Sequence, residues 1–131
     1  MSTPNQSGKG MNVGYIRVSS AGQNTERQVD GLNSLDLDEV VTDKVSGANI
    51  DRPQLRDCLK YLRKHDTLHV YSMDRLARNL LDLQSIVNDL TMRGVRIKFL
   101  KEQLTFEQNG GNPMNTLLLQ VMGAFAEFER S

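Results

Sequence analysis

The chain contains 131 residues and has a mass of 14.8 kDa, enough for one domain with a single hydrophobic core. Hydrophobic residues make up 38% and charged residues 24%, and the 16 basic side chains balance the 16 acidic ones. This composition excludes a disordered chain and argues against a protein that coats any polyanion. The single cysteine, Cys58, excludes an intramolecular disulfide and a cysteine-based zinc site, and no apolar run approaches the length of a membrane span.

The charges are unevenly distributed along the chain. Residues 51–101 carry eleven basic and six acidic side chains, whereas the segments before and after them are net acidic. The neutral total therefore hides a basic middle segment, and this segment is where an anion-binding site is expected.

Short apolar runs alternate with helical patterns, which is typical of a parallel sheet with crossover helices. In chain order, the sequence predicts a disordered tail over 1–10, a strand over 11–18, a helix from 24 or 25 to about 35, a strand over 39–42, a polar loop over 43–51, a helix over 53–62, a strand over 67–71, a helix over 80–94, a strand over 95–100 and a mobile segment over 103–112. We therefore expect an α/β fold with a mostly parallel sheet of four to five strands and helices on both faces.

A long amphipathic helix is predicted to begin at Pro113. Its apolar residues recur at helical spacing and are Met114, Leu117, Leu118, Val121, Met122, Phe125 and Phe128. No glycine or proline ends this pattern before Ser131, so we expect the sequence to be cut inside a longer helix.

Two polar clusters follow the first two predicted strands, where open parallel sheets place their ligand sites. In the first cluster, Ser19 can act as a nucleophile beside Arg17, a cation that stabilises an oxyanion. The second cluster spans residues 42–47 and leads to Asp51-Arg52-Pro53. From residue types alone, an ordinary loop with a surface arginine and a hydrophilic loop with an aspartate cap remain open for these clusters.

A third cluster, residues 72–79, follows the third predicted strand and contains two arginines three residues apart. If this turn is helical, Arg75 and Arg78 project to one side and can bind the oxygens of one phosphate. Together with Arg52 they supply much of the basic excess of the middle segment, which favours a phosphate ligand over a merely solvated helix start. A fourth cluster, residues 126–130, also fits the charged end of a core helix.

Several common chemistries have no motif in this sequence. Gly-rich phosphate loops and dinucleotide fingerprints are absent, and no acidic pair has an evident two-metal spacing. His65 and His69 have no metal-ligand spacing with the cysteine and are expected to be structural. The available chemistry is a serine with arginines, so no cofactor is expected.

Taken together in this order, the clusters resemble the catalytic domain of the serine recombinases, the resolvase and DNA invertase family. The matching motifs are Tyr-Ile-Arg-Val-Ser, Thr-Asp-Lys-Val-Ser-Gly, Asp-Arg-Pro-Gln-Leu, Met-Asp-Arg-Leu-Ala-Arg-Asn and Ala-Glu-Phe-Glu-Arg. The resemblance covers residues 11–131 and implies a resolvase-like fold that ends in a long helix.

The resemblance implies a role for each matching residue. Ser19, rather than Ser20, is implied to attack the DNA phosphodiester, which leaves a 5′-phosphoserine and a free 3′-hydroxyl before strand exchange and re-ligation without metal or ATP. The implied phosphate ligands are Arg17, Arg52, Arg75 and Arg78, with Gln23, Gln28 and Asp74 in the active-site shell. Supporting positions with less specific roles are Asp43, Ser46, Glu129 and Arg130. Asp74 is also a hypothesis for the group that moves a proton to or from the leaving group.

The resemblance also implies partners. These are a double-stranded DNA recombination site, and a homodimer that assembles into a synaptic tetramer through the final helix, where Met114, Leu118, Met122 and Phe125 are expected to contribute. DNA recognition is implied to belong to a C-terminal region absent from this sequence, and a cytoplasmic, DNA-associated location is expected. Inversion, resolution and transposition all stay open as outcomes. A non-catalytic doubly wound binding or dimerisation module is the alternative function.

Overall fold

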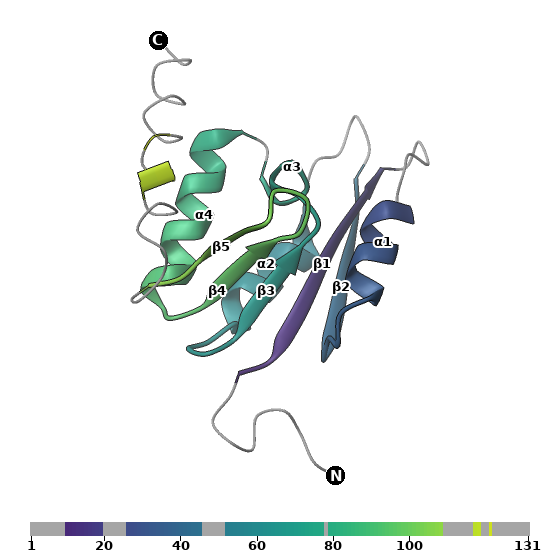
Figure 1. Cartoon of the computed structure of the whole chain (residues 1–131), viewed down its shortest axis with the longest axis horizontal. Helices are drawn as coiled ribbons and strands as arrows, with labels where there is room; N and C mark the ends of the chain where they lie inside the picture. Colours follow the sequence, from purple (N-terminus) through teal and green to yellow (C-terminus); the bar gives the residue numbers. More distant parts are fainter. Residues whose placement is uncertain are drawn as a thin grey trace.

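The computed structural model describes residues 10–19, 26–45, 52–77, 79–108, 117–118 and 121. They contain a five-stranded sheet in the order β2-β1-β3-β4-β5 (Figure 1). The elements are β1 (Asn12–Ser19), α1 (Glu26–Asn33), β2 (Glu39–Val45), α2 (Pro53–Tyr61), β3 (Thr67–Val70), α3 (Met73–Leu76), α4 (Leu80–Met92), β4 (Arg96–Phe99) and β5 (Leu104–Phe106). Strands β2, β1, β3 and β4 are parallel and β5 is antiparallel to β4, so the predicted mostly parallel α/β fold is confirmed.

Alternation along β1 explains why helices cover both faces of the sheet. Val13 and Tyr15 are fully buried in the larger core, which also receives Leu55 of α2 and Leu83 of α4. On the opposite face, the missing side chain of Gly14 leaves room for α1 and the turn after it: a Cβ there would lie 2.7 Å from Leu37 and 3.6 Å from Leu32. Crossovers that run in opposite directions along the sheet place their helices on opposite faces, because such crossovers are right-handed.

Strand β5 corrects the prediction of a mobile segment over 103–112. Residues 104–106 pair with β4, and the ring of Phe106 meets that of Phe99 edge-on at a centroid distance of 6.1 Å. Phe106 is 3% exposed, so burial of this ring against the core favours the strand. Three residues are too few to give a readable periodicity, and this is why the sequence pattern missed it.

Strand β2 is longer than the predicted 39–42. It continues to Val45, whose backbone pairs with Ser19, although residues 43–45 were predicted to start a polar loop. Asp43 is 2% exposed within this extension because its carboxylate is fully engaged in hydrogen bonds. The polar residues in 43–45 are typical of a loop by sequence, although their backbone pairs in the sheet.

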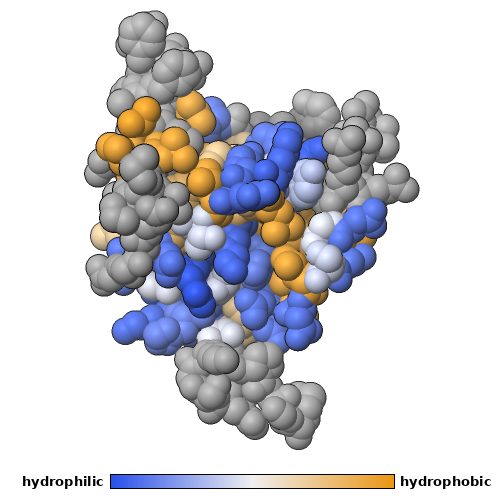
Figure 2. Space-filling view, viewed as in Figure 1, coloured by the Kyte–Doolittle hydropathy of each residue, from blue (hydrophilic) through white to orange (hydrophobic). Residues whose placement is uncertain are grey.

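Only a small part of the predicted final helix is described. Residues 117–118 and 121 are helical, and Leu117, Leu118 and Val121 are 51%, 37% and 55% exposed. Figure 2 shows hydrophobic side chains gathered at this corner of the molecule, beside α4. Within the described part of the chain, no helix is long and apolar enough to span a membrane.

Candidate active site

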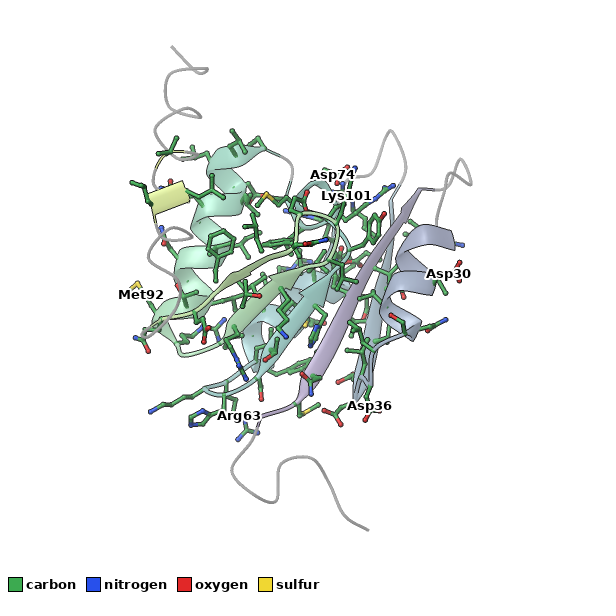
Figure 3. All side chains as sticks on the ribbon, viewed as in Figure 1. Asp30, Asp36, Arg63, Asp74, Met92 and Lys101 are labelled. Atoms are coloured by element: carbon green, nitrogen blue, oxygen red, sulfur yellow. The ribbon has the colours of Figure 1, made fainter. Side chains whose placement is uncertain are left out.

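The predicted site residues come from the edge of the sheet where the parallel strands end. The crossovers from the neighbouring strands β1 and β3 run in opposite directions, to β2 and to β4, so the topological switch point lies between them. Figure 3 shows Asp74 and Lys101 at this edge, with Arg63 and Asp36 at the opposite edge. Open parallel sheets bind their ligands at such a switch point.

Helix α3 is a single turn held by two arginines from distant parts of the chain. The Nη2 of Arg17 donates to the backbone carbonyl of Asp74, and Nη1 of Arg52 donates to the carbonyl of Leu76 at 2.5 Å. A one-turn helix leaves its last carbonyl groups without partners inside the helix, so the guanidinium groups satisfy them. Arg17 and Arg52 therefore both contact the turn that carries Arg75.

Arg52 is also tied to the start of α4. Its Nη2 lies 3.2 Å from Oδ2 of Asp82, and the two side chains are 14% and 20% exposed. Asp82 is itself fixed, because its backbone N–H donates to the Oδ1 of Asn79, the N-cap of α4, at 2.8 Å. The Arg52 guanidinium is therefore held in one direction by α3 and α4 together.

The electrostatics of Arg17 show that positive charges gather here. Burial lowers the pKa of Arg17, and the nearby charges of Arg52 and Arg75 lower it further, while Tyr15 and Asp74 act in the opposite sense. An arginine stays protonated in proteins, so the repulsion is retained as a cost of assembling the cluster. An anion bound between the three guanidinium groups relieves that cost.

Asp74 lies on α3 as an ionised carboxylate. The hydroxyl of Ser72 donates to its Oδ1, and this hydrogen bond lowers the pKa of Asp74 below its ordinary value. Partial burial opposes the shift, whereas the charges of Arg75 and Lys101 support it. At neutral pH this group is therefore a proton acceptor and a hydrogen-bond acceptor.

Asp43 caps helix α2 from the neighbouring strand. Its Oδ1 accepts from the backbone N–H of Gln54 at 2.9 Å, and its Oδ2 accepts from the N–H of Leu55 at 2.8 Å. The Tyr15 hydroxyl donates to the same Oδ2 at 2.9 Å. The sequence assigned Asp43 only a supporting position and did not single out Tyr15 as a site residue. The available signal was that Tyr15 precedes Arg17 by two residues in a strand and so shares its face.

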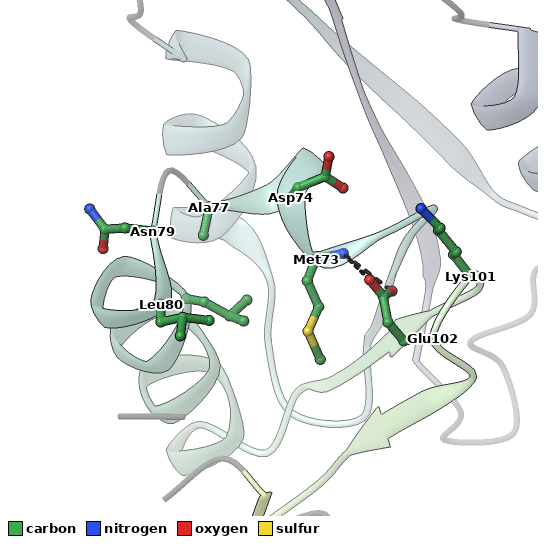
Figure 4. A pocket seen from close by; sticks show the side chains of 8 residues that line it. Met73, Asp74, Ala77, Asn79, Leu80, Lys101 and Glu102 are labelled. Carbon is green, nitrogen blue, oxygen red and sulfur yellow. Dashed lines mark hydrogen bonds between the residues drawn. The ribbon is translucent and has the colours of Figure 1, made fainter. Parts of the chain in front are cut away.

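A pocket of about 490 Å³ adjoins α3 on the side of β4 (Figure 4). Its lining residues are Met73, Asp74, Ala77, Asn79, Leu80, Leu83, Lys101 and Glu102. The Glu102 carboxylate accepts from the backbone N–H of Met73 at 3.2 and 3.3 Å, which links the end of β4 to the start of α3. The sequence pattern missed Lys101 and Glu102, because no motif marked the loop after β4.

Five of the predicted site residues are thus brought to one edge of the sheet, namely Arg17, Asp43, Arg52, Asp74 and Arg75. Ser19 is the last residue of β1 and its backbone pairs with Val45, and Gln28 lies in α1. The predictions for Ser20, Gln23, Ser46, Arg78, Glu129 and Arg130 lie outside the described residues. Among the residues that are described, no group of three or more His, Cys, Asp or Glu side chains is placed to hold a metal ion.

Comparison with known proteins identifies the family. A family model described as the resolvase N-terminal domain matches residues 12–131. The chain belongs to the resolvase family. It is 54% identical over 123 residues to the transposon Tn501 resolvase of Pseudomonas aeruginosa, which covers 94% of this chain and 64% of that protein. It is 40% identical over 120 residues to the serine recombinase gin of Escherichia phage Mu, which covers 92% of this chain and 60% of that protein.

A solved structure shares the fold of this resolvase-family chain. The crystal structure of a resolvase family site-specific recombinase from Streptococcus pneumoniae aligns with a TM-score of 0.65 at 20% identity, covering 93% of this chain and 89% of that chain. The resemblance to the serine recombinases stated from the sequence motifs is therefore confirmed at the level of the family. The chain spans less than two thirds of the length of the curated relatives just described.

Proposed function

We propose that this chain is the catalytic domain of a site-specific serine recombinase, with Ser19 as the nucleophile toward a DNA phosphodiester. The observation that carries the proposal is the gathering of Arg17, Arg52 and Arg75 around α3, beside the strand that ends in Ser19. Three fixed cations fit a phosphodiester, which carries a negative charge that grows in the pentacovalent transition state. The names of the relatives, resolvase and serine recombinase, support the same chemistry.

In the proposed cleavage step, Oγ of Ser19 bonds to phosphorus and its proton is lost. The bond from phosphorus to the 3′-oxygen breaks, and that oxygen takes up a proton to become a free 3′-hydroxyl. The product is a 5′-phosphoserine ester, and attack by a 3′-hydroxyl on this ester restores both the phosphodiester and the serine. The ester conserves the energy of the broken bond, so the proposed reaction requires no ATP.

The direct test is a covalent adduct on gapped recombination-site DNA, in which the short strand that carries the new 3′-hydroxyl dissociates after cleavage and so cannot re-ligate. We expect the full-length protein to form an adduct in the presence of a metal chelator. Ser19→Ala should form none, and the matched variant Ser20→Ala should retain it. An adduct that survives Ser19→Ala, or is lost in Ser20→Ala alone, would assign the nucleophile elsewhere.

We further propose that the substrate is a double-stranded recombination site and that the protein acts as a dimer, paired into a tetramer, through its final helix. The exposure of Leu117, Leu118 and Val121 supports an association surface there. Because the relatives are longer than this chain, we propose that DNA sequence recognition lies outside the matching region. We also propose that the protein is soluble and located in the cytoplasm.

A further inference from the structure

We propose that Tyr15 is a positioning residue, which acts through Asp43 and the first turn of α2 to fix the guanidinium of Arg52. The inference rests on the proposed function, because it takes Arg52 as a ligand of the scissile phosphate. It adds a residue whose own side chain does not reach the phosphate, and it explains why the N-terminus of α2 is anchored to β2.

The first step is the identity of the residue at the N-cap of α2. Arg52 occupies this position and makes no side-chain cap hydrogen bond. A guanidinium carries donors alone, so it cannot accept from the first-turn amides as an N-cap side chain normally does. The N–H groups of Gln54 and Leu55 donate to Asp43 instead, and the arginine side chain extends to α3 and α4.

The second step is the way in which Asp43 is held. It sits on β2, where its backbone pairs with Arg17 rather than with Tyr15, which pairs with Val41. The Tyr15 hydroxyl therefore reaches two residues further along the neighbouring strand to meet Oδ2, the oxygen that also accepts from Leu55. Donors on two sides of this oxygen restrict rotation of the carboxylate, which is 2% exposed and has little water to replace a lost partner.

The third step is the persistence of the Tyr15 donor. Tyr15 is fully buried, and burial, followed by the hydrogen bond to Asp43, raises its pKa above the ordinary value of 10.0. The hydroxyl therefore keeps its proton at neutral pH and remains a donor. Asp43 in turn accepts hydrogen bonds from this hydroxyl and from two backbone N–H groups.

Loss of the Tyr15 hydroxyl is expected to change the position of Arg52 rather than the affinity of the protein for DNA. If the Tyr15 hydroxyl is removed, the carboxylate gains freedom and the first turn of α2 loosens by a small displacement. Arg52 follows, because it is the residue that precedes this turn. A misplaced phosphate ligand slows the chemical step far more than it weakens binding to DNA, where many other contacts contribute.

The experiment compares Tyr15→Phe with Tyr61→Phe in the full-length protein. Tyr61 is a matched control at the other end of α2, since its hydroxyl also donates to a carboxylate, that of Glu39 at 3.0 Å. We expect Tyr15→Phe to slow single-turnover cleavage at saturating protein by about ten-fold with unchanged DNA affinity. Tyr61→Phe should cleave at the native rate.

A second background separates positioning from a general loss of stability. In Arg52→Ala, cleavage followed over long times should show no further loss on adding Tyr15→Phe, while the unfolding midpoint falls by the same amount in both backgrounds. The inference would be overturned if Tyr15→Phe cleaved DNA at the native rate. It would also be overturned if Tyr15→Phe slowed cleavage by the same factor in the native protein and in Arg52→Ala.

Amide hydrogen exchange gives a readout that does not depend on cleavage. The N–H groups of Gln54 and Leu55 should exchange faster in Tyr15→Phe and at the native rate in Tyr61→Phe. Unchanged exchange in Tyr15→Phe overturns the anchoring step. Absence of any adduct with the native protein would instead overturn the proposed function, whereas an active native protein with a fully active Tyr15→Phe would overturn this inference alone.

Discussion

Asp74 illustrates how a single neighbour decides what a carboxyl group can do. The Ser72 hydroxyl lowers the pKa of Asp74, so the group starts the reaction without a proton. Under the proposed function, Asp74 in this form accepts the proton of the 3′-hydroxyl during re-ligation. By microscopic reversibility, cleavage under the same proposal uses the protonated form of Asp74, which must first gain a proton before it returns one to the 3′-oxygen.

We therefore predict that Asp74→Asn slows both cleavage and re-ligation by about 100-fold, because asparagine keeps the acceptor for Ser72 and cannot carry a proton. Single-turnover rates in both directions measure the effect. Asp57→Asn, which removes an equal charge from the exposed side of α2, should leave both rates unchanged. Native rates in Asp74→Asn would show that this carboxylate transfers no proton.

His69 is a buried histidine that makes acid conditions unfavourable for the fold. It is 6% exposed, its Nε2 lies 3.0 Å from Oδ1 of Asn12, and its Nδ1 has no hydrogen-bond partner among the described residues. Burial, followed by the charges of Lys98 and Arg96, lowers the pKa of His69 from 6.5 to about 4. Between these two values the unfolded chain binds more protons than the folded one.

Stability should consequently fall as the pH decreases from 6.5 to 4, by up to about 3 kcal/mol from this residue. Urea unfolding at a series of pH values measures the slope. His69→Gln should remove most of the slope, whereas His65→Asn, at an exposed turn with a positive φ of 80°, should retain it. A slope that is equal in the native protein and in His69→Gln would contradict the assignment.

At the scale of elements, helix α4 ends at Met92, and the glycine that follows two residues later is required for a steric reason. Gly94 has a φ of +84°, and a Cβ at this position would lie 2.8 Å from Cγ of Lys64. Other residues adopt this left-handed conformation at a cost, and the side chain of Lys64 would also have to move. The helix predicted over 80–94 therefore ends two residues earlier, at Met92, and Gly94 lies in the turn that stops it.

We expect Gly94→Ala to lower the free energy of unfolding by about 1–2 kcal/mol. Gly31→Ala is the matched control within α1, since its Cβ would meet side chains at 3.4 Å in an ordinary helical backbone. That variant should be unchanged or more stable by up to about 1 kcal/mol, because alanine favours helices. Urea denaturation of the native chain and the two variants measures these free energies. Equal stability of Gly94→Ala and the native chain would contradict the steric explanation.

Elements that depend on local apolar patterns were predictable from sequence, and elements that depend on distant contacts were not. Strands β1, β3 and β4, the first half of β2 and the two longer crossover helices α2 and α4 follow from short-range periodicity. In contrast, β5 depends on the packing of Phe106 against Phe99, and the second half of β2 depends on hydrogen bonds to Asp43. Both contacts join residues whose pairing no local pattern specifies.

In the candidate site, too, some residues were expected from the sequence and others became apparent only from distant contacts. The family resemblance implied Arg17, Arg52 and Arg75 as ligands of one phosphate, and the sequence pattern added only that their clusters lie at or near the carboxyl ends of parallel strands. The role of Tyr15 depends on the register of β1 against β2, and the position of Glu102 depends on the turn that leads into β5. These details require three-dimensional contacts that residue types and spacing do not contain.

At the scale of the whole molecule, charge and apolar surface are segregated. The basic excess of residues 51–101 includes Arg52 and Arg75 at the sheet edge, so a chain with no net charge still presents a cationic site. Exposed apolar residues lie elsewhere, at Leu117, Leu118 and Val121. A DNA-facing edge and a separate association surface follow from this arrangement under the proposed function.

We predict that Leu118→Glu weakens self-association at least ten-fold, because a charge in an apolar interface must be desolvated. Sedimentation equilibrium over a range of concentrations measures the association. Met92→Glu, a change at an exposed apolar residue of α4, should have no effect. A native chain that is monomeric at every concentration, or equal association in both variants, would contradict a role for the final helix.

Under the proposed function, Ser19 forms a covalent bond to DNA at an edge built from Arg17, Arg52 and Arg75. The most direct measurement is mass spectrometry of peptides from the trapped protein–DNA adduct after nuclease digestion. We expect a nucleoside 5′-phosphate attached to Ser19 and a free 3′-hydroxyl on the released strand. A nucleotide on any other residue, or a phosphate left on the 3′ end, would contradict it.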